Sequence, residues 1–149
     1  MKIVIGSDHA GWNLKGGVVA HLKALGHEVV DVGSHDPAPV DFPDIARALT
    51  AKVLSGEAQR GIMVCGTGVG ASIAANKVRG IRAAVCHDIH SAHQSVEHDD
   101  VNVMCIGAQI VGPWLANDLV ASFIEAKFED NEAHKRRVAK LNEMDQAFK

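Results

Sequence analysis

The chain has 149 residues, a formal net charge of −3, 47% apolar residues and 22% charged residues. This length and this apolar fraction are typical of one globular domain with a sizeable core, which we expect to span residues 1–149, and they exclude a disordered chain. The charge shows no basic excess that would indicate a nucleic-acid partner. No apolar run reaches the length of about 18 residues that a membrane span needs.

In chain order, short apolar runs alternate with segments of helical periodicity, and the first run, MKIVIGS, does not resemble a secretory signal. The runs expected to form strands are residues 1–7, 27–34, 60–66, 81–87 and 102–108. The segments expected to form helices are Trp12–Leu25, Pro43–Ser55, Val69–Lys77, His90–Glu97, Pro113–Lys127 and Asn131–Phe148. Strand and helix alternating in this way predict a parallel sheet covered by helices on both faces. The predicted fold is α/β, a Rossmann-like three-layer αβα sandwich with a five-stranded sheet in the order 2-1-3-4-5 and an extra C-terminal helix.

The C-terminal helix is too charged to be a core helix, yet one stripe of it is apolar. The stripe consists of Val138, Leu141, Met144 and Phe148. A helix of this kind can lie across a neighbouring subunit, so we expect a homodimer or homotetramer.

The cysteines fit neither a paired disulfide framework nor a metal-finger spacing, because there are three of them and they are far apart. We therefore expect reduced thiols and a cytoplasmic location. Cys86 and Cys105 fall in predicted strands and are interpreted as buried packing residues. Nothing in the chain has the spacing of a metal-ligand cluster.

The predicted fold indicates where a ligand would bind. In such sheets, ligands lie beyond the carboxyl ends of the strands, at the point where the strand order reverses. In the expected order this point lies between the first and third strands, so Asp8 and His9 should face Cys65. The segment that begins with His98 and Asp99 follows the fourth predicted helix, and we expect it near Cys65 on the same rim or at a subunit edge.

The sequence CGTGVG, residues 65–70, allows several interpretations. It fits the loose dinucleotide pattern G-x-G-x-x-A but follows the third strand rather than the first, so this match is weak. A Walker A lysine is absent, and Ala71 stands where a cysteine phosphatase would have its arginine. Two interpretations remain. Cys65 is either a small buried residue before a tight turn, or a thiolate whose pKa is lowered by converging backbone amides that also stabilise an oxyanion. The second would suit proton abstraction beside a carbonyl group.

Six stretches carry a family resemblance that spans nearly the whole chain. They are GSDHAGWNLK, VDFPDIA, CGTGVGASIAANKVRGIRAAVC, HDDVNV, IVG and AHKRRV. Together they resemble the ribose-5-phosphate isomerase B family, which includes the galactose-6-phosphate isomerase subunits. The resemblance implies an aldose–ketose isomerase of sugar phosphates, most simply of ribose 5-phosphate to ribulose 5-phosphate, that needs no metal or cofactor and works as a dimer or an assembly of dimers.

The resemblance also implies a role for individual residues. Cys65 would be the base that moves a proton between C2 and C1 through a cis-enediolate, Thr67 would help to steady the enediolate, and His98 would open the sugar ring. Residues implied in substrate binding are Asp8, His9, Gly66, Gly68, Val69, Gly70, Asp99 and Arg137. Of these, Arg137 would hold phosphate at a site completed by the partner subunit.

Four positions depart from the family pattern. Asp99 replaces the common Asn, Phe42 replaces Tyr, and both Gln109 and Ala133 stand where arginine is expected. The substrate could therefore be another sugar, such as a tetrose phosphate, a six-carbon sugar phosphate or an unphosphorylated aldose. Two further alternatives are a nucleotide-binding regulatory module, which the fold also permits, and a non-catalytic subunit of a hetero-oligomer.

Overall fold

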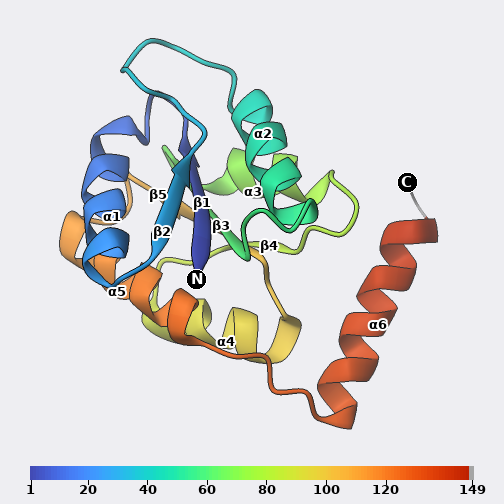
Figure 1. Cartoon of the computed structure of the whole chain (residues 1–149). Coiled ribbons are helices and arrows are strands. Elements are labelled where there is room, and N and C mark those ends of the chain that lie inside the picture. The colour runs from blue at the N-terminus through green and yellow to red at the C-terminus, as the bar shows by residue number, and fades with distance from the viewer. Residues whose placement is uncertain (148–149) are drawn as a thin grey trace.

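The computed structural model describes residues 1–147 and shows a parallel sheet between two layers of helices (Figure 1). The strands are β1 Lys2–Ser7, β2 Glu28–Asp31, β3 Arg60–Cys65, β4 Ala83–Val85 and β5 Val103–Gly107. The helices are α1 Trp12–Ala24, α2 Phe42–Leu54, α3 Val69–Asn76, α4 Ile89–Asp99, α5 Pro113–Glu125 and α6 Glu132–Ala147. The predicted fold class, a five-stranded α/β sandwich with an extra C-terminal helix, is confirmed. No helix within residues 1–147 has the length and apolar character needed to cross a membrane.

The predicted strand order is wrong in its last two positions. The sheet has the order β2-β1-β3-β5-β4, so β5 pairs with β3 and β4 forms the edge. Burial explains the exchange, since all residues of β5 are buried while the three residues of β4 are partly or fully exposed. A strand that is apolar on both faces belongs inside a sheet, and a short strand blunts its edge. The exchange places Gly107 at the end of β5 beside Cys65 at the end of β3.

Alternating side chains of the strands build two separate cores. Ile3 and Ile5 of β1 face a cluster formed with α1, α4 and α5, whereas Val4 faces a cluster formed with α2 and α3. This is the period-two pattern of a strand that is buried on both sides. The two helical layers cover both faces of the sheet, so functional side chains can gather only at its two ends (Figure 1).

Helix α4 extends two residues beyond its predicted end at Glu97, which changes the position of His98 and Asp99. Both residues lie in the last turn of the helix rather than in the loop after it. Asp88 is the N-cap of this helix. Its Oδ1 accepts a hydrogen bond of 2.7 Å from Ser91 N and so satisfies a free amide of the first turn.

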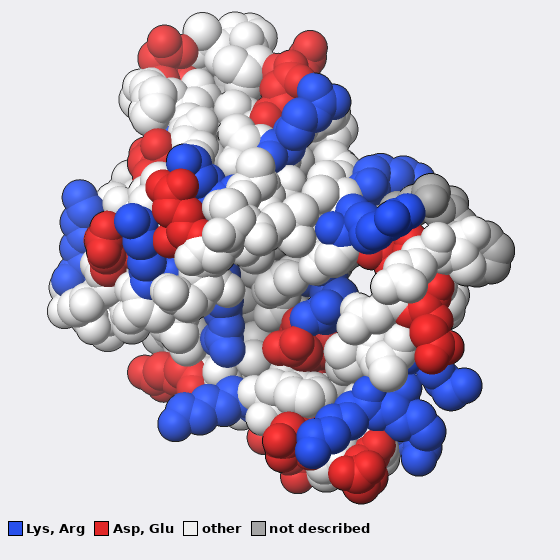
Figure 2. Space-filling view, turned by 45° about the vertical axis from the view of Figure 1, so that its right-hand side comes forward, with Lys and Arg blue, Asp and Glu red and all other residues white. Residues whose placement is uncertain are grey.

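The ribbon of helix α6 stands apart from the two helical layers (Figure 1), but its side chains reach the body of the domain, since Asp145 Oδ2 accepts a hydrogen bond of 2.6 Å from Gly80 N. Its buried residues are His134 and Val138, while Leu141 and Met144 of the predicted apolar stripe are 42% and 56% exposed. Phe148, the last residue of that stripe, lies outside the described residues. Figure 2 shows Lys and Arg side chains over the first half of α6 and a hollow between this helix and the body, which Leu141 and Met144 line together with Ile81.

Candidate active site

Cys65 is carried by β3 to the carboxyl edge of the sheet, where its side chain is almost buried. The backbone amides of Thr67 and Gly68 donate hydrogen bonds to its sulfur. Gly68 has a φ of 80° and is the N-cap of α3, so the chain turns sharply into the helix at this point. Glycine adopts this left-handed conformation without the steric cost of a Cβ. The loop therefore points two amides and a helix N-terminus toward the thiol.

The segment after β5 holds this loop in place. Ala108 N donates to Cys65 O at 2.8 Å, and Gln109 N donates to Gly66 O at 2.9 Å. Gly107 packs so closely that a Cβ added there would lie 2.7 Å from the backbone carbonyl carbon of Thr67. The unexpected neighbourhood of β3 and β5 is thus what clamps the Cys65 loop.

Asp8 lies beside Cys65, as the predicted facing of β1 and β3 requires. Its side chain is buried, Oδ1 accepts a hydrogen bond of 2.9 Å from Gly11 N, and the carboxylate also accepts a hydrogen bond from the thiol. Burial raises the pKa of the Cys65 thiol, and the neighbouring Asp8 raises this pKa further, against the smaller opposite effect of the amides of Gly68 and Thr67. The expectation of a lowered pKa is therefore wrong, because desolvation and a like charge both disfavour the thiolate.

Other predicted binding residues line the rim around this pair. His9 is exposed, and its Nδ1 accepts a hydrogen bond of 3.3 Å from Val40 N. Thr67 is also exposed, and its Oγ1 accepts a hydrogen bond of 3.3 Å from the amide of the exposed Val69. Gly70 contacts the ring of Phe42, since a Cβ added at Gly70 would lie 2.9 Å from that ring.

Sequence reasoning missed Lys15, which supports the site from behind. Its ammonium is buried, donates to Asp31 Oδ1 at 2.8 Å and to Ser34 O at 2.5 Å, and borders a hollow of about 460 Å³. Ser34 N in turn donates to Ser7 O at 2.6 Å, so Lys15 fixes the end of the strand that presents Asp8. A lysine one turn into a predicted helix gives no sequence signal of burial.

His87 is a second residue without a sequence signal. Its Nε2 accepts a hydrogen bond of 2.9 Å from Gly107 N, so His87 fixes the start of the clamping segment from the side of β4. The two remaining cysteines are buried packing residues, as predicted, and burial raises the pKa of Cys86 to about 11.

His98 and Asp99 lie at the opposite edge of the sheet from Cys65. Helix α4 runs back from the end of β4, and Arg82, which precedes β4, donates from Nε to the backbone oxygens of Asp99 and Asp100 at 3.1 and 2.8 Å. The last turn of α4 is therefore anchored where the strands begin. Of the two positions expected for His98, the rim near Cys65 is wrong within one chain, because a helix that crosses between parallel strands returns to their amino ends. The other, a subunit edge, stays a prediction.

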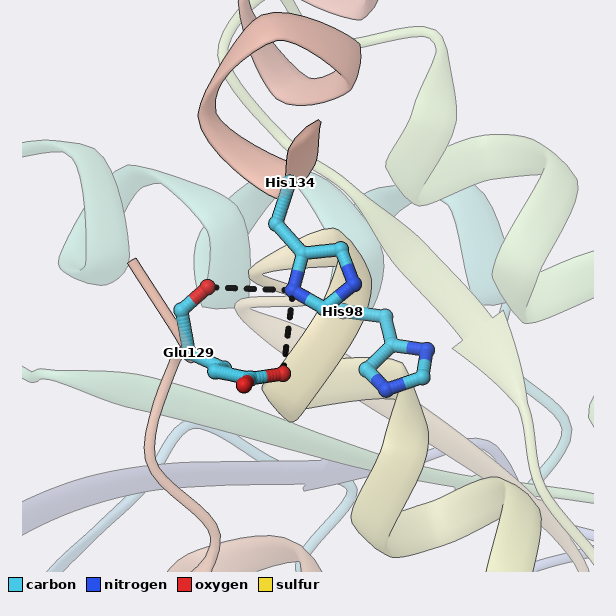
Figure 3. A group of neighbouring side chains, drawn as sticks. All are labelled: His98, Glu129 and His134. Carbon is cyan, nitrogen blue, oxygen red and sulfur yellow. Dashed lines mark hydrogen bonds and ion pairs between the residues drawn. The ribbon is translucent and has the colours of Figure 1, made fainter. Parts of the chain in front are cut away.

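His98 instead belongs to a cluster with Glu129 and His134 (Figure 3). The two imidazole rings stack with their centroids 4.3 Å apart and an interplanar angle of 29°. His134 Nδ1 lies 3.0 Å from the backbone oxygen of Glu129 and 3.4 Å from its Oε2. One ligand atom from each of the three residues lies within 4.8 Å of the others. Arg137 is exposed on α6, three residues beyond His134 and hence on the same side of the helix.

A buried thiol at the carboxyl edge, a carboxylate beside it and backbone amides that converge on it are groups that suit an isomerase acting by proton transfer. Comparison with known proteins agrees with this class. The family model described as Ribose/Galactose Isomerase matches residues 3–141. The chain belongs to this family.

Individual relatives cover nearly the whole chain. Ribose-5-phosphate isomerase B of Escherichia coli (strain K12) is 43% identical over 145 residues, 97% of each chain. D-erythrulose-4-phosphate isomerase of Pectobacterium atrosepticum is 41% identical over 132 residues, 87% of this chain and 86% of the relative. The solved structure of Clostridium thermocellum ribose-5-phosphate isomerase B superposes with a TM-score of 0.97 at 47% identity and full coverage of both chains.

Proposed function

We propose that the protein is an aldose–ketose isomerase that converts ribose 5-phosphate to ribulose 5-phosphate with Cys65 as the base. The observation that carries the proposal is the pairing of Cys65 with Asp8 beneath the amides of Thr67 and Gly68. This pairing lies at the carboxyl edge of a sheet whose relatives include ribose-5-phosphate isomerases. A cytoplasmic location and turnover without a metal or cofactor stay predictions of the same proposal.

The geometry suits proton transfer between C2 and C1 of an open-chain sugar. The C2 proton is weakly acidic, so its removal needs a strong base and a group that stabilises the enediolate oxygen. A thiol with a raised pKa gives a thiolate that is a stronger base, and Asp8 is placed to accept the thiol proton when the substrate arrives. The same sulfur then returns the proton to C1 while the hydroxyl proton of O2 passes to O1, and the hydroxyl of Thr67 and the amides of the loop stabilise the negative oxygen of the intermediate.

Ring opening requires a second subunit in this proposal. His98 lies at the amino edge of the sheet, so it can act on a sugar bound at Cys65 only if it belongs to a partner chain. A two-fold homodimer would bring the amino edge of one chain to the carboxyl edge of the other at two equivalent sites. The exposed Leu141 and Met144 of α6, with the exposed Arg137 on the same helix, support such a contact.

A second candidate substrate is a tetrose phosphate. Gln109, which is uncharged, lies against Gly66, and a Cβ added at Gly66 would be 3.3 Å from its Oε1. An arginine implied by the family pattern at position 109 would offer a charge-assisted phosphate contact worth about 1.5–3 kcal/mol, which glutamine does not supply. A relative with 41% identity is named for D-erythrulose 4-phosphate, and another with 38% identity for galactose 6-phosphate.

The test is turnover of a panel of sugars by the purified protein without added metal. The panel contains ribose 5-phosphate, erythrose 4-phosphate, allose 6-phosphate, ribose and allose, each with a Cys65→Ala control. We expect Cys65-dependent turnover with the highest kcat/KM on ribose 5-phosphate. A higher value on another sugar would transfer the assignment to that sugar, and a lack of turnover on the whole panel would contradict the proposal.

A further inference from the structure

We propose that His98, Glu129 and His134 form a binding site for a zinc-like divalent cation, and that a bound cation inhibits the enzyme. The binding itself follows from the cluster. The inhibition rests also on the function proposed above for His98.

The three side chains converge from three separate parts of the chain (Figure 3). His98 lies in the last turn of α4, Glu129 lies in the linker after α5, and His134 lies in the first turn of α6. Zinc binds imidazole nitrogen and carboxylate oxygen at about 2.0–2.2 Å in tetrahedral geometry, which places ligand atoms about 3.4 Å apart. The ligand atoms here are within 4.8 Å of one another, so small side-chain rotations would bring them to one ion.

The least mobile ligand is already oriented. The side chain of His134 is 9% exposed, and its Nδ1 lies 3.4 Å from Oε2 of Glu129, 3.0 Å from the backbone oxygen of Glu129 and 3.1 Å from Nδ2 of Asn131. Nδ1 of His134 and Oε2 of Glu129 are thus adjacent before any ion binds, and these contacts fix the orientation of the ring. The other two side chains can adjust, because His98 is 36% exposed and Glu129 is 56% exposed.

The backbone keeps the ligands close before any ion arrives. Glu129 N donates to Glu97 O at 2.8 Å, so the linker is attached to the last turn of α4 beside His98. The amide oxygen of Asn131 accepts a hydrogen bond of 2.9 Å from His134 N, which fixes the start of α6 on the same linker. The ion would open the ring stack and connect α4 to α6 through side chains.

The donor set selects the class of cation. Two imidazole nitrogens and one carboxylate oxygen suit Zn²⁺, Co²⁺ or Ni²⁺, whereas Mg²⁺ and Ca²⁺ prefer sites made of oxygen alone. Three protein ligands leave a fourth position of the tetrahedron for water or a small ligand. A cation on His98 occupies the lone pair that ring opening needs. His98 therefore cannot act on the sugar ring while the metal is bound.

The experiment uses the full chain and measures binding separately from turnover. Zn²⁺ affinity is measured by calorimetry, and Co²⁺ is added as a spectroscopic probe because four-coordinate Co²⁺ absorbs visible light. Glu129→Gln should weaken Zn²⁺ binding at least tenfold while leaving turnover without metal unchanged. Glu132→Gln is the matched control, since Glu132 is an exposed carboxylate three residues away whose ion pair is with Lys135. It should change neither quantity.

Inhibition is measured on the preferred sugar with increasing Zn²⁺ and then with a chelator. We expect reversible inhibition of the unmodified protein, at least tenfold weaker inhibition of Glu129→Gln, and no effect of Mg²⁺. Zn²⁺ binding that survives Glu129→Gln and His98→Ala but is lost in Cys65→Ala, with a thiolate charge-transfer band for Co²⁺, would overturn the proposal. So would an absence of Zn²⁺ binding. Failure of the proposed function would look different, because binding would persist while no sugar is converted in metal-free buffer.

Discussion

The two ends of the sheet are built by different means. At the carboxyl edge, Cys65 and Asp8 are buried, and backbone amides and close glycine contacts hold them in place. At the amino edge, His98 and Glu129 are partly exposed side chains that meet His134 on α6. The first end has the buried groups that the proposed proton transfer requires. The second is accessible and can be shared with a partner subunit or an ion.

The largest expected effect is at the carboxyl edge. Cys65→Ala should lower kcat by about 10²–10⁴-fold, the usual contribution of a positioned general base. Steady-state kinetics on the preferred sugar measures the loss, and thermal unfolding checks that the fold is intact. A decrease of less than tenfold would remove Cys65 from the role of base.

The second prediction concerns the division of the site between subunits. His98→Ala and Cys65→Ala should each be inactive alone, but a mixture unfolded and refolded together should regain about a quarter of normal turnover, because half of the dimers carry one intact shared site of two. Turnover of the refolded mixture is compared with that of each variant treated alone. If both groups acted within one chain, mixing would restore nothing.

The third prediction tests the clamp on the Cys65 loop. Gly107→Ala introduces a methyl group 2.7 Å from a backbone atom of Thr67, so we expect a loss of stability of about 1–3 kcal/mol. Denaturant unfolding measures the change. Gly112→Ala is the matched control, since a Cβ there would meet nothing within 4 Å and its φ is −83°. Equal stability of the two variants would show that the close contact carries no cost.

The smallest expected effect is a shift of the pKa of Cys65. Asp8 raises this pKa, so Asp8→Asn should lower it, and alkylation of the thiol should begin at a lower pH. Burial is the larger cause and remains, so the pKa should stay above its ordinary value. The rate of alkylation against pH measures the midpoint in both proteins, with Cys86 and Cys105 protected because they are 1% and 0% exposed, against 8% for Cys65. An upward shift would contradict the proposed contact.

Much of the carboxyl edge could be predicted before the structure. The first and third strands were expected to lie side by side, and their ends place Asp8 beside Cys65 because strands of a parallel sheet finish at one edge. The pKa of Cys65 could not be predicted in the same way. The direction of the pKa shift depends on how completely the thiol is buried and on the carboxylate beside it. The sequence of the loop indicates only the backbone amides, which lower the pKa.

The sequence by itself determined the αβα sandwich, since alternating apolar runs and amphipathic segments can bury their apolar faces only by layering helices on a sheet. Tertiary structure alone decided that β5 lies between β3 and β4 and that β4 forms the edge of the sheet, because this order depends on how deeply each strand is buried. It also decided that His98 lies far from Cys65 and close to His134. Long-range packing of α4, the linker and α6 brings these histidines together, and no local spacing in the chain encodes that contact.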